Sequence, residues 1–290
     1  MNLSFLAGNY AAIDYGISNT DVITVVDGRV RTAKQSTHGE PSPVQVIDLL
    51  ARCGTDLSVV DLIATTGGRH RLLPETIEGV PIVPVGELEA IARGGQALAG
   101  LDDSALLAEP LLVVSAGSGT AYMAARGHAY AHVIGSGVGG GTMLGLGRLL
   151  LGTADPRMID KLALGGDPNG VDLALSDVVM GPIGSLPPDT TAVNFGRMAR
   201  AAGAPDHADL AAGIVTLVGQ VVGTLAVTAA RGEKLPRAVF TGHLTDMASM
   251  RMAIERVSHF FGMPLDMPEN AGYATAAGAL LYAVEQQERR

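Results

Sequence analysis

The sequence predicts an α/β protein built from two related lobes rather than from one doubly wound sheet. Two blocks of the chain each begin with an apolar strand that enters a turn of small residues and is followed by a β-hairpin. These turns lie at 14–18 and 115–120, and helical patterns follow each block. The 38 glycines among 290 residues are nearly twice the usual share of about 7%.

The composition excludes several classes of protein. Hydrophobic residues make up 47% and charged residues 17% of the chain, which excludes a disordered protein, and the glycines lack a collagen-like period. The formal net charge is −9 and no basic patch is visible, which argues against nucleic acid as a partner. An acidic chain still accepts a nucleotide where backbone amides and Mg²⁺ hold the phosphates.

Cysteine content and hydropathy indicate where the protein works. Cys53 is the only cysteine, which excludes an intrachain disulfide and favours a reducing compartment, the cytoplasm. The first residues lack the pattern of a signal peptide. The stretch Leu210–Ala230 is long and apolar enough to suggest a transmembrane helix, but it contains glycines, threonines and a glutamine and has no flanking aromatic belt. We therefore predict a buried helix and no membrane partner.

The first block alternates strand and helix patterns. A turn at Asp27-Gly28 follows the second strand and is typical of a hairpin. Strands are predicted at 11–14, 21–26, 62–65 and 80–85. Helices are predicted at 43–53 and 87–98, from apolar residues at helical spacing.

The second block begins with a strand at 111–115 that is apolar almost throughout, as expected for a strand covered on both faces. A second strand and a turn at Arg126-Gly127 follow, and a further buried strand is predicted at 238–241. Helices are predicted at 142–151, 155–164, 190–202, 207–231, 246–261 and 270–288. We divide the chain into an N-terminal lobe of residues 1–108 and a C-terminal lobe of residues 109–290.

The strongest local indication of a binding site is the segment Gly135-Ser-Gly-Val-Gly-Gly-Gly-Thr142, which leads into a helical pattern. Consecutive glycines cost conformational entropy when they become ordered, so packing alone does not explain them. They let the backbone approach a ligand, and the start of the next helix directs amides and a positive dipole at it. We predict a phosphate here in preference to a plain flexible turn. The segment matches neither a Walker A loop nor a Rossmann fingerprint.

Two carboxylates, those of Asp14 and Glu87, occupy positions where they can bind a metal ion or accept a proton. Asp14 ends an apolar strand inside the first turn and suits Mg²⁺ or its water shell, although Asp is also an ordinary turn residue. Glu87 opens a helix directly after an extended run, where it can act as a general base. The residues alone favour a simpler role for Glu87, which is to stabilise the helix dipole. The seven histidines show no metal-ligand spacing, and a serine nucleophile elbow is absent.

Taken in order along nearly the whole chain, the motifs resemble those of the type II pantothenate kinases. These motifs are Ile13-Asp14-x-Gly16, Thr66-Gly67-Gly68, Val85-Gly86-Glu87-Leu88-Glu89, Gly117-Ser118-Gly119-Thr120, Gly137-Val138-Gly139-Gly140-Gly141-Thr142, Thr191-Ala192-Val193-Asn194-Phe195-Gly196 and Glu269-Asn270-Ala271-Gly272. The resemblance implies the two-lobed actin-like ATPase fold, which is ribonuclease H-like, with mixed sheets flanked by helices. It also implies an ATP-dependent kinase that uses Mg²⁺ and phosphorylates pantothenate in coenzyme A biosynthesis, as a cytoplasmic homodimer.

The resemblance also assigns roles to individual residues. It implies that Glu87 is the general base and that Asp14 is the carboxylate beside Mg²⁺. Gly242 and His243 are expected near the nucleotide, and His132 near the substrate. The residues expected to hold the phosphates are Gly16 and Ser18 in the first turn, Ser118 and Gly119 in the second, and Gly139, Gly140, Gly141 and Thr142 in the third.

The sequence departs from the family pattern at two places. The family's first turn usually reads Asp-x-Gly-Gly-Thr-x-x-Lys, whereas here Ile17, Ser18 and Asp21 replace the second glycine, the threonine and the lysine. His132 stands where the family carries an arginine, and an imidazole is a poorer clamp for a carboxylate than a guanidinium. Two alternatives therefore stay open: a kinase for a different hydroxyl compound, and a nucleotide-binding homologue without kinase activity.

Overall fold

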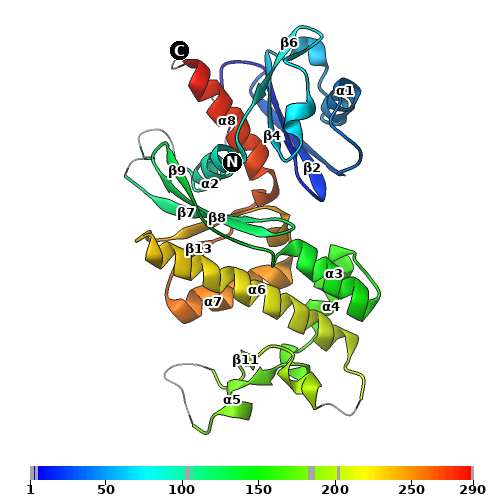
Figure 1. Cartoon of the computed structure of the whole chain (residues 1–290), viewed down its shortest axis with the longest axis vertical. Helices are drawn as coiled ribbons and strands as arrows, with labels where there is room; N and C mark the ends of the chain where they lie inside the picture. Colours follow the sequence, from blue (N-terminus) through cyan, green and yellow to red (C-terminus); the bar gives the residue numbers. More distant parts are fainter. Residues whose placement is uncertain are drawn as a thin grey trace.

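The computed structural model describes residues 3, 6–101, 105–106, 108–181, 187–200 and 203–288. In the view of Figure 1 the first sheet lies at the top and the second sheet lies below it, with helices between the two sheets and below the second. The first sheet has the strand order β3-β2-β1-β4-β6-β5. Its strands are β1 (Tyr10–Tyr15), β2 (Asn19–Val26), β3 (Arg29–Ser36), β4 (Leu62–Gly67), β5 (Thr76–Ile77) and β6 (Val80–Pro84).

The second sheet repeats this arrangement with the order β13-β12-β7-β8-β9. In each sheet three antiparallel strands form consecutive hairpins, and the first of them also pairs with a parallel strand. The repetition agrees with the two related blocks in the sequence. The strands are β7 (Leu111–Ala116), β8 (Thr120–Arg126), β9 (Ala129–Ser136), β12 (Ala238–Thr241) and β13 (Leu265–Asp266).

Helices cover the faces of both sheets. Helix α1 packs against the outer face of the first sheet, and α6 and α7 cover the outer face of the second. The main helices are α1 (Pro43–Arg52), α2 (Glu87–Leu98), α3 (Gly140–Leu151), α4 (Pro156–Gly165), α6 (His207–Gly232), α7 (Ala248–Phe261) and α8 (Ala274–Glu288).

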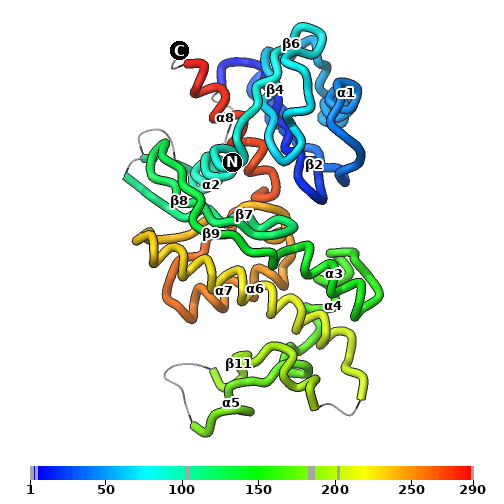
Figure 2. The backbone as a smooth tube through the Cα atoms, in the orientation of Figure 1, coloured from blue at the N-terminus to red at the C-terminus, as the bar shows by residue number. Residues whose placement is uncertain are grey.

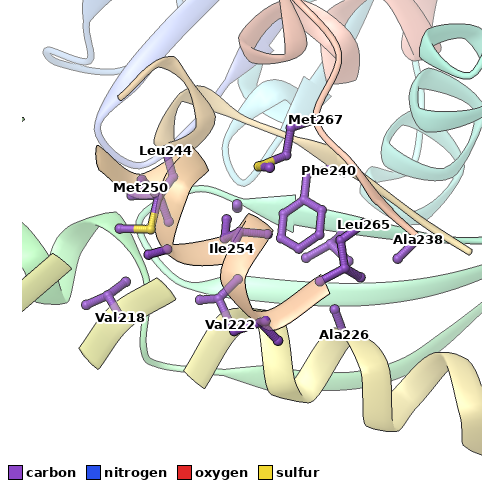
Figure 3. Close-up of a cluster of buried hydrophobic side chains, with 14 of the residues drawn as sticks. Val218, Val222, Ala226, Ala238, Phe240, Leu244, Met250, Ile254, Leu265 and Met267 are labelled. Atoms are coloured by element: carbon purple, nitrogen blue, oxygen red, sulfur yellow. The ribbon is translucent and has the colours of Figure 1, made fainter. Parts of the chain in front are cut away.

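Helix α6 is long and apolar enough, by length and composition, to cross a membrane, but 67% of its most apolar window is buried inside the protein. Figure 3 shows how the α6 residues Val218, Val222 and Ala226 line one side of a cluster that contains Phe240. Ile254 of α7 packs into the same cluster. The apolar stretch is therefore a core helix, as the sequence predicts.

The helix expected over 190–202 is wrong for its described residues. This segment forms the short strand β11 (Thr191–Val193) and a 3-10 helix, η4 (Gly196–Ala199). Asp172 explains the difference, because its carboxylate accepts from the amide of Phe195 at 2.7 Å and from the Thr191 hydroxyl at 3.1 Å. Phe195 has a φ of 55°, which interrupts a right-handed helix. Residues 201 and 202 lie outside the described part.

Strand β11 belongs to a small separate unit. It pairs with β10 (Leu173–Ala174), which leads into the short helix α5 (Leu175–Val178). The unit lies at the end of the molecule farthest from α1 (Figure 1). It is therefore remote from the first sheet.

Helices α2 and α8 lie together between the two sheets (Figure 1 and Figure 2). Helix α2 packs against the second sheet, and α8, from the end of the chain, packs against the first. The two helices cross at glycines, since a Cβ at Gly94 would overlap the carbonyl of Ala274, and one at Gly278 would overlap the carbonyl of Ala90. The lobe division at residue 108 stays a prediction.

This crossing predicts that Gly278→Ala lowers the free energy of unfolding by about 1–3 kcal/mol, because a methyl group at this position forces the helix backbones apart. Gly145→Ala in α3 is the matched control, since nothing lies within 4 Å of the added methyl. That change is expected to stabilise by roughly 0.5–1 kcal/mol through helix propensity. Urea denaturation measures both, and equal effects of the two substitutions would contradict the close crossing.

Candidate functional site

The two turns singled out in the sequence meet in the structure. The turn between β1 and β2 holds Ser18, the turn between β7 and β8 holds Ser118, and their hydroxyl oxygens are 2.7 Å apart. Within the described part of the chain, the amides of Ile17, Ser18, Ser118 and Gly119 donate to no protein acceptor. Open amides beside two hydroxyls form a site for an anion such as a phosphate.

Glycines 139–141 bring the start of α3 against the second turn. The amide of Gly140 donates to the carbonyl of Gly117, and that of Gly141 to the carbonyl of Ser118, each at 2.8 Å. A Cβ at Gly139 would lie 2.9 Å from the carbonyl carbon of Gly119. The glycine run therefore permits backbone-to-backbone packing, and two of the amides that were expected to face a phosphate already have protein acceptors.

The remaining turn residues are held locally. The Thr142 hydroxyl donates to the carbonyl of Gly137 at 3.0 Å, so it closes the third turn on itself. At Gly16 a side chain is excluded, because a Cβ there would lie 2.7 Å from the carbonyl oxygen of Asn19. Phosphate contacts of Gly139, Gly140, Gly141 and Thr142 stay a prediction.

A row of charged residues crosses the first sheet beside the first turn. Asp14 on β1 is directly opposite Asp21 on β2, and Asp21 is directly opposite Lys34 on β3. Residues directly opposite each other project from the same face of a sheet. This face looks toward the other lobe, because Nε2 of His243 lies 2.8 Å from the Asp21 carboxylate.

The pKa of the Asp14 carboxyl group is raised far above its ordinary value. Burial raises its pKa to about 7, the charges of Asp21 and Glu87 add to the rise, and His243 opposes it. Asp14 and Glu87 therefore lie within electrostatic reach of each other, as expected if both border one cleft. Among the described residues no three His, Cys, Asp or Glu side chains cluster to hold a metal, so a metal at Asp14 would take its other ligands from phosphates and water.

His243 connects the lobes through two carboxylates. Its Nδ1 lies 2.7 Å from Asp246 in its own 3-10 helix, η5 (His243–Asp246), and its Nε2 reaches Asp21 across the cleft. Burial lowers the pKa of His243, but the hydrogen bonds to Asp21 and Asp246 outweigh it and raise the pKa to about 9. The ring is therefore charged at neutral pH, and both of its N–H groups donate.

The residue before His243 explains its position. Gly242 has a φ of 94°, and a Cβ there would overlap the carbonyl of Ala116, the last residue of β7. Glycine at this point lets the chain pass directly beside the start of the second turn. Gly242 therefore lies beside the start of the second turn, and the expected place of Gly242 and His243 near the nucleotide stays a prediction.

Glu87 and His132 occupy exposed positions. Glu87 is the first residue of α2. The cavity next to it, of about 250 Å³, is bordered by Thr65, His70, Arg71, Leu73, Pro74, Glu75, Ile82, Pro84, Val85 and Gly86. His132 lies on β9, and no described hydrogen bond or ion pair joins it to Asp14, Glu87 or the two turns. Glu87 and His243 therefore both lie within electrostatic reach of Asp14, and the two serine turns meet, whereas the role of His132 stays a prediction.

Comparison with known proteins identifies the family of the chain. The model of the Fumble family matches residues 102–282. The chain belongs to the Fumble family. A type II pantothenate kinase of Staphylococcus epidermidis is 29% identical over 223 residues, which cover 76% of this chain and 83% of the relative. A type II pantothenate kinase of Bacillus cereus is 26% identical over 225 residues, with 77% and 82% covered.

Solved structures share the fold of this Fumble family member. The activator of the 2-hydroxyisocaproyl-CoA dehydratase from Clostridium difficile with bound ADPNP has a TM-score of 0.61 at 15% identity and covers 97% of this chain and 98% of its own. A ROK family glucokinase from Streptomyces griseus in complex with glucose and AMPPNP has a TM-score of 0.58 at 15% identity, with 96% and 100% covered. These similarities confirm the predicted two-lobed actin-like ATPase fold.

The charged state of His243 predicts a pH-dependent stability. Its pKa is raised from 6.5 to about 9, so its contribution of about 3 kcal/mol is fully present below pH 6.5 and is lost as the pH rises through 9. Asp21, Asp246, Lys34 and the edge of Tyr273 face the ring. We expect His243→Asn to flatten the fall in unfolding free energy between pH 7 and 9.5.

Urea denaturation at closely spaced pH values measures this slope. The rise in the pKa of Asp14 from its ordinary value of 3.8 to about 7 acts in the same direction but at lower pH, so the slope above pH 8 reports mainly on His243. His132→Asn is the matched control, because His132 is exposed and its replacement should leave the slope intact. An unchanged slope in the His243 variant would exclude the ion pair as its source.

Proposed function

We propose that this chain transfers the γ-phosphoryl group of ATP to the hydroxyl group of pantothenate, the activity that the names of its curated relatives state. The observation that carries the proposal is the meeting of the Ser18 and Ser118 turns, with open amides, beside Asp14. Phosphoryl transfer depends on positioning and on neutralising phosphate charge, and glycine turns beside a carboxylate suit both.

The phosphates would bind between the first two turns. The hydroxyls of Ser18 and Ser118 would then exchange their mutual hydrogen bond for phosphate oxygens, and the amides of these turns would donate to the same anion. Gly16 and Gly119 keep the turns tight, and Gly139–Thr142 braces the second turn from behind. Gly242 and His243 would border the nucleotide.

Asp14 fits a place beside Mg²⁺. Burial and neighbouring carboxylates raise its pKa to about 7, and a divalent cation stabilises the ionised form of such a group. When bound, Mg²⁺ neutralises phosphate oxygens of ATP. Asp14 would hold the ion from the first sheet, with a single carboxylate and the phosphates as ligands, as is usual for this ion.

Glu87 is the proposed general base. It begins α2 within electrostatic reach of Asp14, so an acceptor hydroxyl placed between them would lose its proton to Glu87 as it attacks the γ-phosphorus. His132 is the proposed substrate contact. Its imidazole stands where the family carries an arginine and is a poorer clamp for a carboxylate, which favours a second candidate, a kinase for a related hydroxyl compound that lacks the carboxylate of pantothenate.

We place this activity in the cytoplasm and propose that the protein is a homodimer. Its binding partner would be a small-molecule substrate, and neither nucleic acid nor a membrane is expected as a partner. The single buried cysteine and the negative net charge support this placement. The homologue without kinase activity remains the alternative if no alcohol is phosphorylated.

Glu87→Gln is expected to reduce ADP release from ATP, Mg²⁺ and pantothenate by roughly 10²- to 10⁴-fold, because the amide cannot accept the proton. Binding of a non-hydrolysable ATP analogue should be retained. Glu89→Gln, two residues along α2, is the matched control and should keep activity. Full turnover by the Glu87 variant would exclude it as the base, and wild-type turnover only with other alcohols in a substrate panel would support the second candidate.

Asp14→Asn is expected to move activity and stability in opposite directions. Its pKa near 7 means that the ionised carboxylate is disfavoured in the folded protein, so the amide should raise the unfolding free energy at pH 8 by roughly 2–4 kcal/mol. The same change should abolish Mg²⁺-dependent ADP release. Calorimetric unfolding at pH 5 and pH 8 tests the first expectation, and a variant less stable at pH 8 than wild type would contradict it.

A further inference from the structure

The cleft around Asp14 carries too much negative charge to accept ATP unaided. Four carboxylates interact there, those of Asp14, Asp21, Glu87 and Asp246. His243 is charged, but Asp21 and Asp246 use both of its N–H groups. Binding a nucleotide polyphosphate at the adjacent turns therefore calls for a further cation that is free to move.

Lys34 is such a cation. It is exposed, and within the described part of the chain it makes no ion pair with a carboxylate. Its Nζ lies 3.3 Å from Nδ1 of His243, whose proton already points to Asp246. An ammonium held against a charged imidazole has no acceptor there, and the two like charges repel each other.

The strand of Lys34 is attached to the first phosphate turn. Thr37, just beyond the end of β3, donates from its amide to the carbonyl of Ser18 at 3.0 Å and from its hydroxyl to the carbonyl of Gly16 at 2.8 Å. Lys34 contacts His243. The residue before His243 is Gly242, which packs against the start of the second turn. The strand of Lys34 is thus joined to the first turn, and its contact residue His243 is joined to the second, while a lysine has a flexible four-carbon stem.

We propose that Lys34 is the positively charged side chain that binds the phosphates of the nucleotide in this protein, beside the hydroxyls of Ser18 and Ser118. On binding, its ammonium leaves Nδ1 of His243 and contacts phosphate oxygens at the Ser18 and Ser118 turns, while Asp21 and Asp246 keep His243 in place. Asp21 occupies the strand position directly opposite Lys34, so the positive charge of this cleft comes from β3 instead of β2. The inference rests on the proposed function, because it needs ATP as the ligand.

The test is calorimetric titration of the full-length protein with a non-hydrolysable ATP analogue, with Mg²⁺, and separately with adenosine. Lys34→Met should weaken binding of the ATP analogue roughly 10- to 100-fold, as expected for one lost charge-assisted contact. Adenosine, which has no phosphate, should bind equally to both proteins. Lys34→Arg should restore most of the affinity, and the wild-type affinity for the analogue should fall more steeply with salt than that of Lys34→Met.

Lys161→Met is the matched control, because Lys161 is an exposed lysine on α4; it should bind both ligands as wild type does. Equal binding of the analogue by Lys34→Met and wild type would overturn the inference and leave the proposed function standing. An equal loss for the analogue and adenosine would indicate a structural role and would also overturn it. Wild-type protein that binds no ATP analogue would overturn both the inference and the proposed function.

Discussion

The close crossing of α2 and α8 is the constraint on which the arrangement of the two sheets depends. Each helix covers a different sheet, so the distance between their axes sets the distance between the lobes. Gly94 and Gly278 let the backbones touch, and this close approach helps to bring the turn between β1 and β2 to the turn between β7 and β8. The 2.7 Å contact between Ser18 and Ser118, at the mouth of the cleft, is a consequence of packing far from it.

Electrostatics then determines what the closed cleft is able to hold. The ion pair between Asp21 and His243 joins side chains that are 8% and 18% exposed, where a charge without a partner is costly. Pairing these two charges removes both of them from ligand binding. The charges left for the proposed function are Asp14, whose pKa is raised to about 7, and the exposed Lys34. In the proposed function, a site with these properties would bind a metal and a polyphosphate together better than either alone.

Much of the fold follows from the sequence because its signals are local. Strand ends, the hairpin at Asp27-Gly28 and the apolar helix α6 are all read from neighbouring residues. The segment 190–200 could not be predicted in this way, because its conformation depends on Asp172, which lies far from it in the chain and bonds Phe195 and Thr191. The glycine run at 139–141 was predicted to bind a phosphate, and that contact stays a prediction. Its amides, however, bond the second turn, and such a contact between two loops leaves no periodic pattern.

Lys34, the residue opposite Asp21 on the neighbouring strand, is part of the proposed site and can be placed from the sequence. A two-residue turn at Asp27-Gly28 pairs Val26 with Arg29 and, counting outward, Asp21 with Lys34, so the hairpin alone places a lysine beside the aspartate. The family motif has its lysine at the position of Asp21, because a motif lists residues in their order along a single strand. A cleft responds to where a charge lies in space, and a neighbouring strand, at the ~4.8 Å spacing of a sheet, supplies it equally well. A substitution that removes a cation from a motif therefore removes the positive charge from the site only when no neighbouring strand places another cation there.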